Sequence, residues 1–546
     1  MKKHKGLVIT GALLLGIVIL ILIFPYLFNV NQFRPTIEEH LQSSLGRRVV
    51  IGDLELSLIA GGISAKDISI ADDPNYSQQP FLKAKSLDVG VELLPLIFSH
   101  SLHVNSATLR EPELHLVRGS GGKWNFSSLG ASPPKAASRN QRGHARKNAP
   151  PFEAPTPEAP AGNFSIATLR VSDGRVIVSS VANPSRQHVY DSVELKASNI
   201  GYDNTIPFSF SANTPGGGKL QMDGTTGPLS RTDMAETPLR LSMLVNHMDL
   251  ASTGFVDSSS GLAGIMDFQG VLLSDGNILK TNGMAKTDRL RLVRSGGPAR
   301  QPVTFEYASQ YSLKRQTGSL TRGTLQTGRT TAKLSGNYQK QGDTTIVHMK
   351  LNGNNMPLQE VQGLLPAFGV NLPAGSSLQG GTVSANLSID GPIDHLVITG
   401  PLNIANTRLA GFSMTSGIAS TLNGANGGRD TIIQTLSSNL RMAPDGIQAD
   451  NVQLILPQFG TITGNGVISP NNALDFHMLA KTNDGSGFMG GLFRTKGQIP
   501  FLVQGTTSQP VFLPDMGKSL GNMITNPAKG VGGLFQGLFG GKKKQQ

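Results

Sequence analysis

Side chains that carry chemistry are few and scattered in this chain. His100 and His103, the closest pair among eleven histidines, lie beside an expected strand and have no third metal ligand nearby, so we expect surface residues and no metal site. Asp72 and Asp73 are adjacent carboxylates, but Pro74 follows them, and this composition is typical of a turn. Neither pair predicts acid–base catalysis.

The sequence also lacks the usual catalytic and cofactor-binding motifs. There is no cysteine, which excludes thiolate catalysis, disulfides and Cys-ligated metals. Residues 517–519 resemble the end of a phosphate-binding loop, but Phe512 stands where its first glycine is required. Nucleophile-elbow, dinucleotide-binding and zinc-protease motifs are absent. We therefore expect no catalytic residue, no metal and no cofactor, in a protein that is not an enzyme.

Positive charge is concentrated in three short parts of the chain. The net charge is +12 over 546 residues, yet the bases cluster before residue 6, in residues 131–162 and at 542–544. The remaining body is nearly balanced, and the single Trp and seven Tyr do not alternate with basic residues as a single-strand binder requires. We expect no nucleic-acid partner.

Residues 6–30 form an almost unbroken apolar run behind a basic stub, residues 1–5. Its length exceeds the ~20 residues that cross a bilayer, and the preceding lysines favour a cytoplasmic N-terminus with the rest of the chain outside. A cleaved signal peptide is the alternative, but its apolar region is usually shorter and ends at small residues. The bulky flank Phe24–Phe28 favours an uncleaved, single-pass transmembrane helix.

A short amphipathic helix is expected after this run. Phe33, Ile37, Leu41 and Leu45 recur every four residues, which is one apolar stripe on a helix. Gly46 is the expected stop, and the arginines that follow it suit the negative end of the helix dipole. The stripe either docks on the body of the protein or lies along the membrane surface.

Beyond residue 46 the apolar period changes from four to two, which predicts strands with one apolar and one wet face. The predicted fold is mostly β: an elongated, curled antiparallel sheet, shaped as a groove, with few helices. Another helix is expected from Met356 to Leu365, ended by Pro366. The residues predicted to line the groove are Leu54, Leu56, Leu58, Leu87, Val89, Val91, Leu93, Leu114, Leu116, Val383, Leu387, Ile389, Val452, Leu454, Leu456, Leu474, Phe476 and Met478.

Composition also divides the chain. Residues 31–130 form an N-terminal module, the Pro/Ala-rich basic segment 131–162 a disordered linker, and residues 163–516 the elongated β-groove domain. Residues 517–546 are expected to be a flexible tail, either frayed or in contact with a membrane through apolar residues ahead of three lysines. Residues 107–110, Ala-Thr-Leu-Arg, recur at 167–170, as in loosely repeated units.

The two ends of the chain resemble the AsmA family. Residues 31–70 carry the family's N-terminal pattern, including Gly46-Arg47-Arg48, and it continues to Gly122-Lys123-Trp124-Asn125; residues 499–505 and 510–515 resemble its C-terminal strand pair. The resemblance implies a chorein-like N-terminal module, an inner-membrane anchor, a periplasmic body and an apolar β-groove. It implies movement of phospholipids between inner and outer membranes, or an influence on outer-membrane protein assembly.

The physics of a one-sided sheet points the same way. An apolar face of this length must be covered by a second sheet, by helices or by a ligand, and helices are few. Acyl chains gain ~0.8 kcal/mol per CH₂ removed from water, roughly 20 kcal/mol gross for a diacyl lipid. A lipid conduit with membrane and phospholipid partners is the first hypothesis. A non-enzymatic assembly factor or scaffold with a closed β-core, in contact with outer-membrane or envelope proteins, is the alternative, and an envelope enzyme the third.

Overall fold

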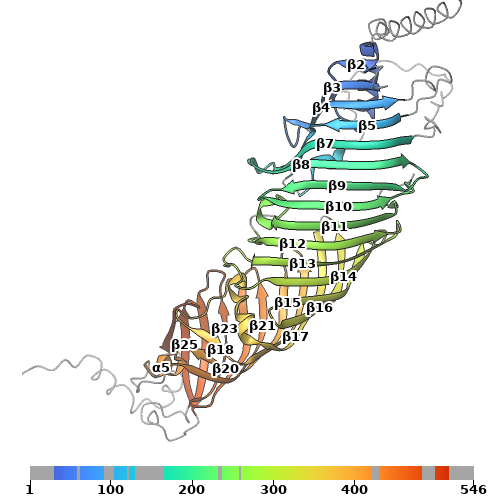
Figure 1. Cartoon of the computed structure of the whole chain (residues 1–546). Helices are drawn as coiled ribbons and strands as arrows, with labels where there is room; N and C mark the ends of the chain where they lie inside the picture. The colour runs from blue at the N-terminus through green and yellow to red at the C-terminus, as the bar shows by residue number, and fades with distance from the viewer. Residues whose placement is uncertain are drawn as a thin grey trace, which may run out of the picture. The chain divides into compact units, whose positions relative to one another are not determined.

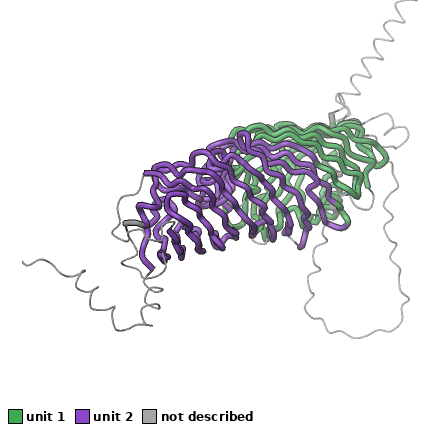
Figure 2. The backbone as a smooth tube through the Cα atoms, turned by 90° about the horizontal axis from the view of Figure 1, so that it is seen from below, with its two compact units in different colours: residues 1–256, 266–281, 312–314 green, residues 257–265, 282–311, 315–546 purple. Residues whose placement is uncertain are grey.

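A computed structural model describes residues 30–57, 62–91, 104–119, 122–129, 165–230, 236–256, 260–342, 344–420, 429–482 and 498–515. These residues are mostly β, in a large mixed sheet with few helices (Figure 1), which confirms the predicted fold class. The chain divides into two compact units (Figure 2): unit 1 is residues 1–256, 266–281 and 312–314, and unit 2 is the remainder.

Several predicted segments lie outside the described residues. They are the anchor 6–30 except for Val30, the linker 131–162, the tail 517–546, and His100 with His103. Within the described part of the chain, no helix combines the length and the apolar character needed to cross a bilayer.

Unit 1 is built on strands that follow one another along the chain. Its strands are β1 (Val49–Val50), β2 (Leu54–Ser57), β3 (Gly62–Ala71), β4 (Pro80–Val91), β5 (Val104–Arg110), β6 (Glu113–Arg118), β7 (Ser165–Ser180), β8 (Asn183–Gly201), β9 (Ile206–Thr214), β10 (Gly218–Thr226) and β11 (Leu239–Asp249). The 3-10 turns η2 (Asn125–Ser128) and η4 (Leu250–Ser252) follow β6 and β11. The division between the units falls within β12 (Ala263–Ser274), β13 (Ile278–Arg291) and β14 (Val303–Ser312).

The prediction of an antiparallel sheet is wrong at one place in unit 1. Strands β5 and β6 both pair with β7 in parallel, with one constant register from Val104–Ile166 to Arg118–Ser180. The long segment between β6 and β7 makes this possible, because parallel neighbours need a connection of a dozen residues or more. The repeated Ala-Thr-Leu-Arg segments therefore lie on paired strands, with Ala107 opposite Leu169.

Three residues with left-handed backbone interrupt neighbouring strands of unit 1 at one level of the sheet. Asp67, Glu111 and Asp173 have φ of 48°, 46° and 54°, and each falls at a gap in the register of its ladder. Ala65 and Ile68, on either side of Asp67, both pack into the same buried cluster, although simple alternation would place them on opposite faces. Such irregularities bend strands and increase their twist.

The predicted first helix is present. A 3-10 turn, η1 (Val30–Phe33), leads into α2 (Arg34–Leu45). Gly46 has φ 65° and donates its N–H to the Gln42 carbonyl at 2.9 Å, which confirms it as the stop.

Polar contacts dock α2 onto unit 1. The Glu38 carboxylate accepts the Ile51 N–H at 2.7 Å, and Leu45 packs against the N-terminal buried cluster. Ile37 and Leu41 are 38% and 39% exposed. Only part of the predicted apolar stripe is therefore covered by the described chain.

Unit 2 continues with antiparallel ladders. Its strands are β15 (Thr317–Thr327), β16 (Thr330–Gln341), β17 (Thr344–Pro357), β18 (Ser377–Gln379), β19 (Thr382–Pro392), β20 (Val397–Ala410), β21 (Thr431–Ala443), β22 (Gly446–Leu456), β23 (Gly460–Ile468), β24 (Leu474–Thr482), β25 (Gln498–Gly505) and β26 (Pro510–Pro514).

The helices of unit 2 are short. The helix predicted from Met356 begins two residues later as α4 (Leu358–Gln362), because Met356 and Pro357 still pair with β19. Pro366 lies in the first turn of a 3-10 helix, η5 (Leu365–Phe368), and does not end the helix as predicted. Another helix, α5 (Met414–Ser420), follows β20.

Candidate functional site

Directly opposed residues in neighbouring strands project to the same side of a sheet, so the registers show which side chains share a face. In unit 1 one such row crosses β2 to β11 without a polar residue. Its members are Leu54, Ala65, Leu87, Leu109, Val171, Leu195, Phe210, Met222 and Met243.

A second apolar row lies two residues away. It consists of Leu56, Ile63, Val89, Ala107, Leu169, Ala197, Phe208, Gly224 and Leu241. The row between the two projects to the other side and is entirely polar: Glu55, Ser64, Asp88, Thr108, Arg170, Lys196, Ser209, Asp223 and Ser242. The sheet of unit 1 therefore has one apolar face and one polar face.

Unit 2 repeats this arrangement. One apolar row runs through Leu320, Gly336, Met349, Ile389, Ile398, Met442, Ile447, Ile468 and Leu474. A second runs through Met356, Val383, Ile404, Leu436, Leu454, Ile462, Ala480 and Ile499. An intervening row is polar except for Val467: Ser335, Lys350, Ser388, Thr399, Arg441, Gln448, Val467 and Asp475.

These rows place most of the predicted groove residues. Eight of them are members of the rows: Leu54, Leu56, Leu87, Val89, Val383, Ile389, Leu454 and Leu474. Five lie two or four residues along the same strand from a member: Leu387, Val452, Leu456, Phe476 and Met478. Leu114 and Leu116 oppose Val176 and Val178 of β7. Leu58, Leu93 and the side chain of Val91 lie outside the described residues.

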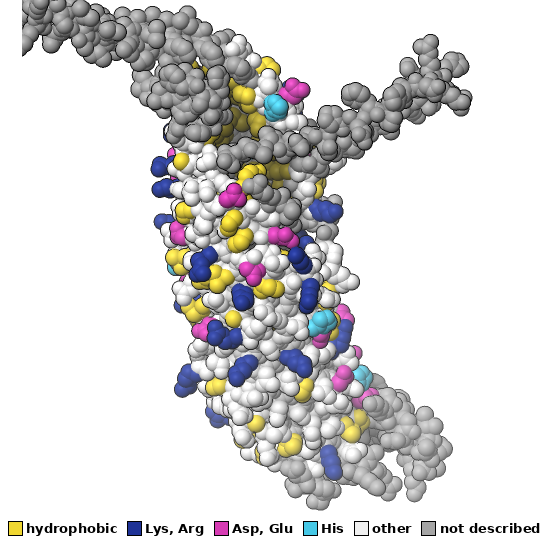
Figure 3. Space-filling view, turned by 90° about the vertical axis from the view of Figure 1, so that its right-hand side faces the viewer, with side chains coloured by type: hydrophobic (Ala, Val, Ile, Leu, Met, Phe, Trp, Pro, Cys, Tyr) yellow, Lys and Arg dark blue, Asp and Glu magenta, His cyan; other side chains and the backbone are white. Residues whose placement is uncertain are grey.

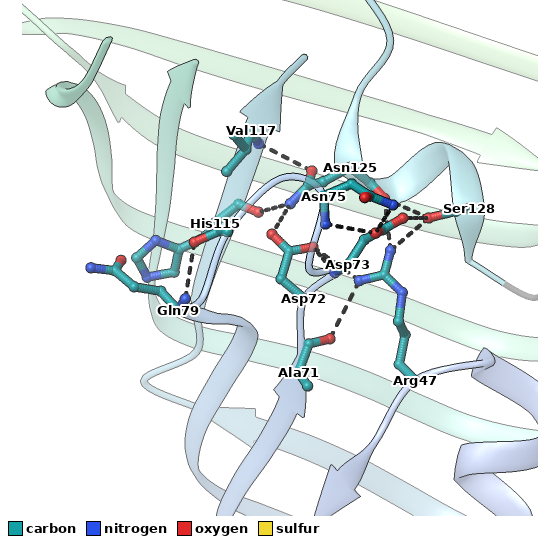
Figure 4. A network of polar contacts seen from close by, with 11 residues as sticks. Arg47, Ala71, Asp72, Asp73, Asn75, Gln79, His115, Val117, Asn125 and Ser128 are labelled. Carbon is teal, nitrogen blue, oxygen red and sulfur yellow. Dashed lines mark hydrogen bonds and ion pairs between the residues drawn. The ribbon is translucent and has the colours of Figure 1, made fainter. Parts of the chain in front are cut away.

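A buried polar network fixes the N-terminal part of unit 1 (Figure 4). Arg47 donates to the Asp72 carboxylate at 2.9 Å, and the exposed fractions of the two side chains are 6% and 0%. Asn125, fully buried, donates to Asp72 and to the His115 carbonyl, both at 2.8 Å, and accepts the Val117 N–H at 3.0 Å. The Asn125 side chain thus supplies the edge of β6 with the hydrogen bonds of a missing strand.

This network revises two expectations. Arg47 is a buried ion-pair partner and not only a cation at the end of α2. Asp72 is held inside the protein, while its neighbour Asp73 is the turn residue: it accepts the Asn75 N–H at 3.0 Å. That backbone hydrogen bond, helped by Ser128 and by the charge of Arg47, lowers the pKa of the Asp73 carboxyl below its usual value.

The network joins the two parts of the N-terminal sequence that carry the family pattern, Gly46-Arg47-Arg48 and Gly122–Asn125. Residues 1–253 match the sequence model of the AsmA family. The chain belongs to the AsmA family. No curated protein and no solved structure matches it. Membership of this family and a large β-sheet are compatible with lipid transport or another function in the cell envelope.

Protein covers the apolar face of this AsmA-family chain unevenly. In unit 1, Leu54 is 5% exposed within a cluster that includes Val30, Val49 and Ile68. In unit 2, Leu454 and Leu456 belong to a second cluster. Between the ends of these units, residues such as Phe210 of β9 and Leu387 of β19 are only half-buried.

The second cluster includes a helix that the sequence analysis missed. Ile418 of α5 is fully buried against Leu456, Ile462 and Phe501. Strand alternation predicts which face a residue is on, but not whether another element covers it. The short α5, with only Met414 and Ile418 as large apolar residues, gives no helical period long enough to be recognised.

The polar face of unit 1 contains a cavity of about 640 Å³. Its lining includes Thr108, Arg170, Lys196, Ser209 and Asp223 of the polar row. Charged side chains of both signs are also spread over the face of the molecule shown in Figure 3. Within the described ranges, no three His, Asp or Glu side chains lie close enough together to hold a metal ion.

Proposed function

We propose that this AsmA-family chain is an inner-membrane-anchored periplasmic protein that binds the acyl chains of phospholipids on the apolar face of its sheet and conducts them toward the outer membrane. It does so without a chemical step. The observation that carries the proposal is the succession of apolar rows in each unit, half-buried where no described helix covers them. An apolar surface that the chain leaves partly open suits a ligand that is itself apolar.

The energetics favour a lipid over water on this face. Each CH₂ removed from water contributes ~0.8 kcal/mol, so two acyl chains lying along the rows gain roughly 20 kcal/mol before entropic and headgroup costs. The polar headgroup remains in water at the rim. The sheet then lowers the barrier for a lipid to leave one bilayer and cross an aqueous gap, and the amount of lipid held depends on the continuity of the apolar rows.

The test is a matched pair of substitutions in β19. Leu387 lies on the apolar face opposite Leu351, and its neighbour Asn386 is exposed on the polar face. Leu387→Arg places a guanidinium on the apolar face, and displacing about three CH₂ groups lowers lipid affinity about 50-fold. Asn386→Arg adds the same side chain to the wet face and leaves lipid binding unchanged.

Phospholipid that co-purifies with the full-length chain, quantified by mass spectrometry, reports the outcome. The proposal predicts stoichiometric lipid with the wild type and with Asn386→Arg, and little with Leu387→Arg, at unchanged circular dichroism. Equal lipid content in both variants contradicts it.

A second function is favoured by one specific observation. The cluster around Ile418, Leu454 and Phe501 is a closed, dry core, which suits an envelope scaffold or outer-membrane assembly factor. If the whole apolar face is closed in this way, no lipid co-purifies, and substitutions of exposed residues alter outer-membrane protein levels while Leu387→Arg acts only by unfolding the chain.

A further inference from the structure

The buried network around Asn125 holds a turn that presents aromatic side chains to solvent. Trp124 and Phe126 flank the fully buried Asn125, and their rings stack with centroids 6.1 Å apart and planes 13° apart. Phe126 is 43% exposed. The turn is fixed from inside by Asn125, whose carbonyl also accepts from the Arg47 guanidinium at 2.8 Å.

Two further apolar residues of unit 1 adjoin this turn. Phe255, which follows η4, lies 5.5 Å from Trp124 between ring centroids and is 53% exposed. Val181, at the tip of the β7–β8 hairpin, is 40% exposed and donates its N–H to the carbonyl of Arg118, the residue that is bridged to Trp124. We call Trp124, Phe126, Val181 and Phe255 the aromatic patch.

A purely structural role does not explain the aromatic patch. Packing alone would bury Phe126 and Phe255, yet about half of each side chain is left in water. A satisfied buried network that holds exposed aromatic residues in place is typical of a surface built for contact. Trp and other aromatic rings favour the interface between water and lipid, where one part of the ring is wet and another apolar.

The charge around the aromatic patch indicates the partner. Residues 118–129 contain Arg118 and Lys123 and no acidic residue, and residues 178–183 and 250–256 contain no charged residue. The basic segment 131–162 follows directly in the sequence. Each Lys or Arg near an anionic membrane contributes about 1 kcal/mol of attraction. The patch is therefore complementary to anionic phospholipid headgroups.

Unit 1 is also the unit that begins at the apolar run. Val30, the last residue of that run, is 7% exposed in the N-terminal cluster, and Arg47 connects the end of α2 to Asn125. A chain held in the membrane by residues 6–30 therefore carries the aromatic patch within a rigidly connected part of the same unit.

We propose that the aromatic patch docks unit 1 onto the surface of a bilayer containing anionic phospholipid. The rings enter the interface, and Arg118 and Lys123 contact the headgroups. This docking does not depend on lipid carried along the sheet. It fixes the orientation of unit 1 on the membrane that anchors the chain.

Trp124 is the only tryptophan in the chain, so its fluorescence reports on the patch alone. The full-length chain is reconstituted into vesicles of phosphatidylcholine with or without phosphatidylglycerol, and quenching by iodide and by phospholipid brominated in its acyl chains is measured. With phosphatidylglycerol, Trp124 is expected to be shielded from iodide and quenched by brominated lipid. In the Phe126→Ser/Phe255→Ser variant the shielding is lost. Ile393→Ser, at a residue of unit 2 that is 63% exposed, is the matched control and retains it.

Three results overturn the proposal: iodide quenching that is equal in anionic vesicles and in detergent, shielding that needs no anionic lipid, or shielding that appears only when envelope proteins are added. The last result assigns the patch to a protein partner. Co-purified lipid is measured on the same samples. Lipid retained by Phe126→Ser/Phe255→Ser separates failure of docking from failure of lipid binding on the sheet, and unchanged circular dichroism shows that the variant is folded.

Discussion

Replacing Asn125 by alanine tests whether the N-terminal part of unit 1 depends on one buried amide. The substitution removes three hydrogen bonds, to Asp72 and the His115 carbonyl at 2.8 Å and from the Val117 N–H at 3.0 Å. None of these groups gains water in exchange, because Asn125 is fully buried. Each orphaned group costs about 1–3 kcal/mol and Asp72 keeps its ion pair with Arg47, so we expect a loss of roughly 4 kcal/mol in the free energy of unfolding.

The fluorescence of Trp124 measures this loss directly. As the only tryptophan and the neighbour of Asn125, it follows the unfolding of this part of the chain in urea. Asn75→Ala is the control: it removes an exposed side-chain hydrogen bond to Asp73 and should change the unfolding free energy by less than about 0.5 kcal/mol. If Asn125→Ala unfolds at the same urea concentration as Asn75→Ala, the network does not hold the turn and the reasoning is refuted.

Two further predictions concern Tyr190 and Ile418. Burial raises the pKa of Tyr190 to about 12, so the folded state holds this proton more tightly than the unfolded state, and stability is lost as the pH rises from the ordinary tyrosine pKa through this value. The tyrosinate absorbance of the wild type minus that of Tyr190→Phe should therefore titrate near pH 12, and a midpoint at the ordinary value would contradict the burial. Ile418→Ala leaves a cavity in the cluster of unit 2 and should lower the unfolding free energy by about 3 kcal/mol, whereas Ile432→Ala, at a residue 44% exposed, should lower it by less than about 0.5 kcal/mol. Equal losses in chemical denaturation would show that α5 is not packed as described.

Local patterns in the sequence predicted the faces of the sheet well. Leu387 and Ile389 alternate with Asn386 and Ser388, and the registers place the two pairs on opposite faces. The helix stop at Gly46 needed only the left-handed conformation that glycine adopts readily. In both cases the physical cause lies within a few residues of the chain.

Features set by distant residues were not predictable from the same patterns. Arg47 receives its role from Asp72 and Asn125, whose contacts with it span 25 and 78 residues, and a single sequence does not reveal such pairs. The parallel pairing of β5 with β7 depends on the path of a long connection, although the repeated Ala-Thr-Leu-Arg segments hinted at it. Alternation also did not distinguish Leu456, which is 2% exposed in the cluster around α5, from the half-buried Leu387.

The central claim is that acyl chains lie against the apolar face of the sheet, and site-specific photocrosslinking tests it most directly. The photoreactive residue benzoylphenylalanine is placed at 387 on the apolar face or at 386 on the polar face of the full-length chain, and membranes are irradiated before purification. Mass spectrometry of the intact chain should show the added mass of a phospholipid with the residue at 387 and none with the residue at 386. Equal crosslinking at both positions, or none at 387, contradicts the account.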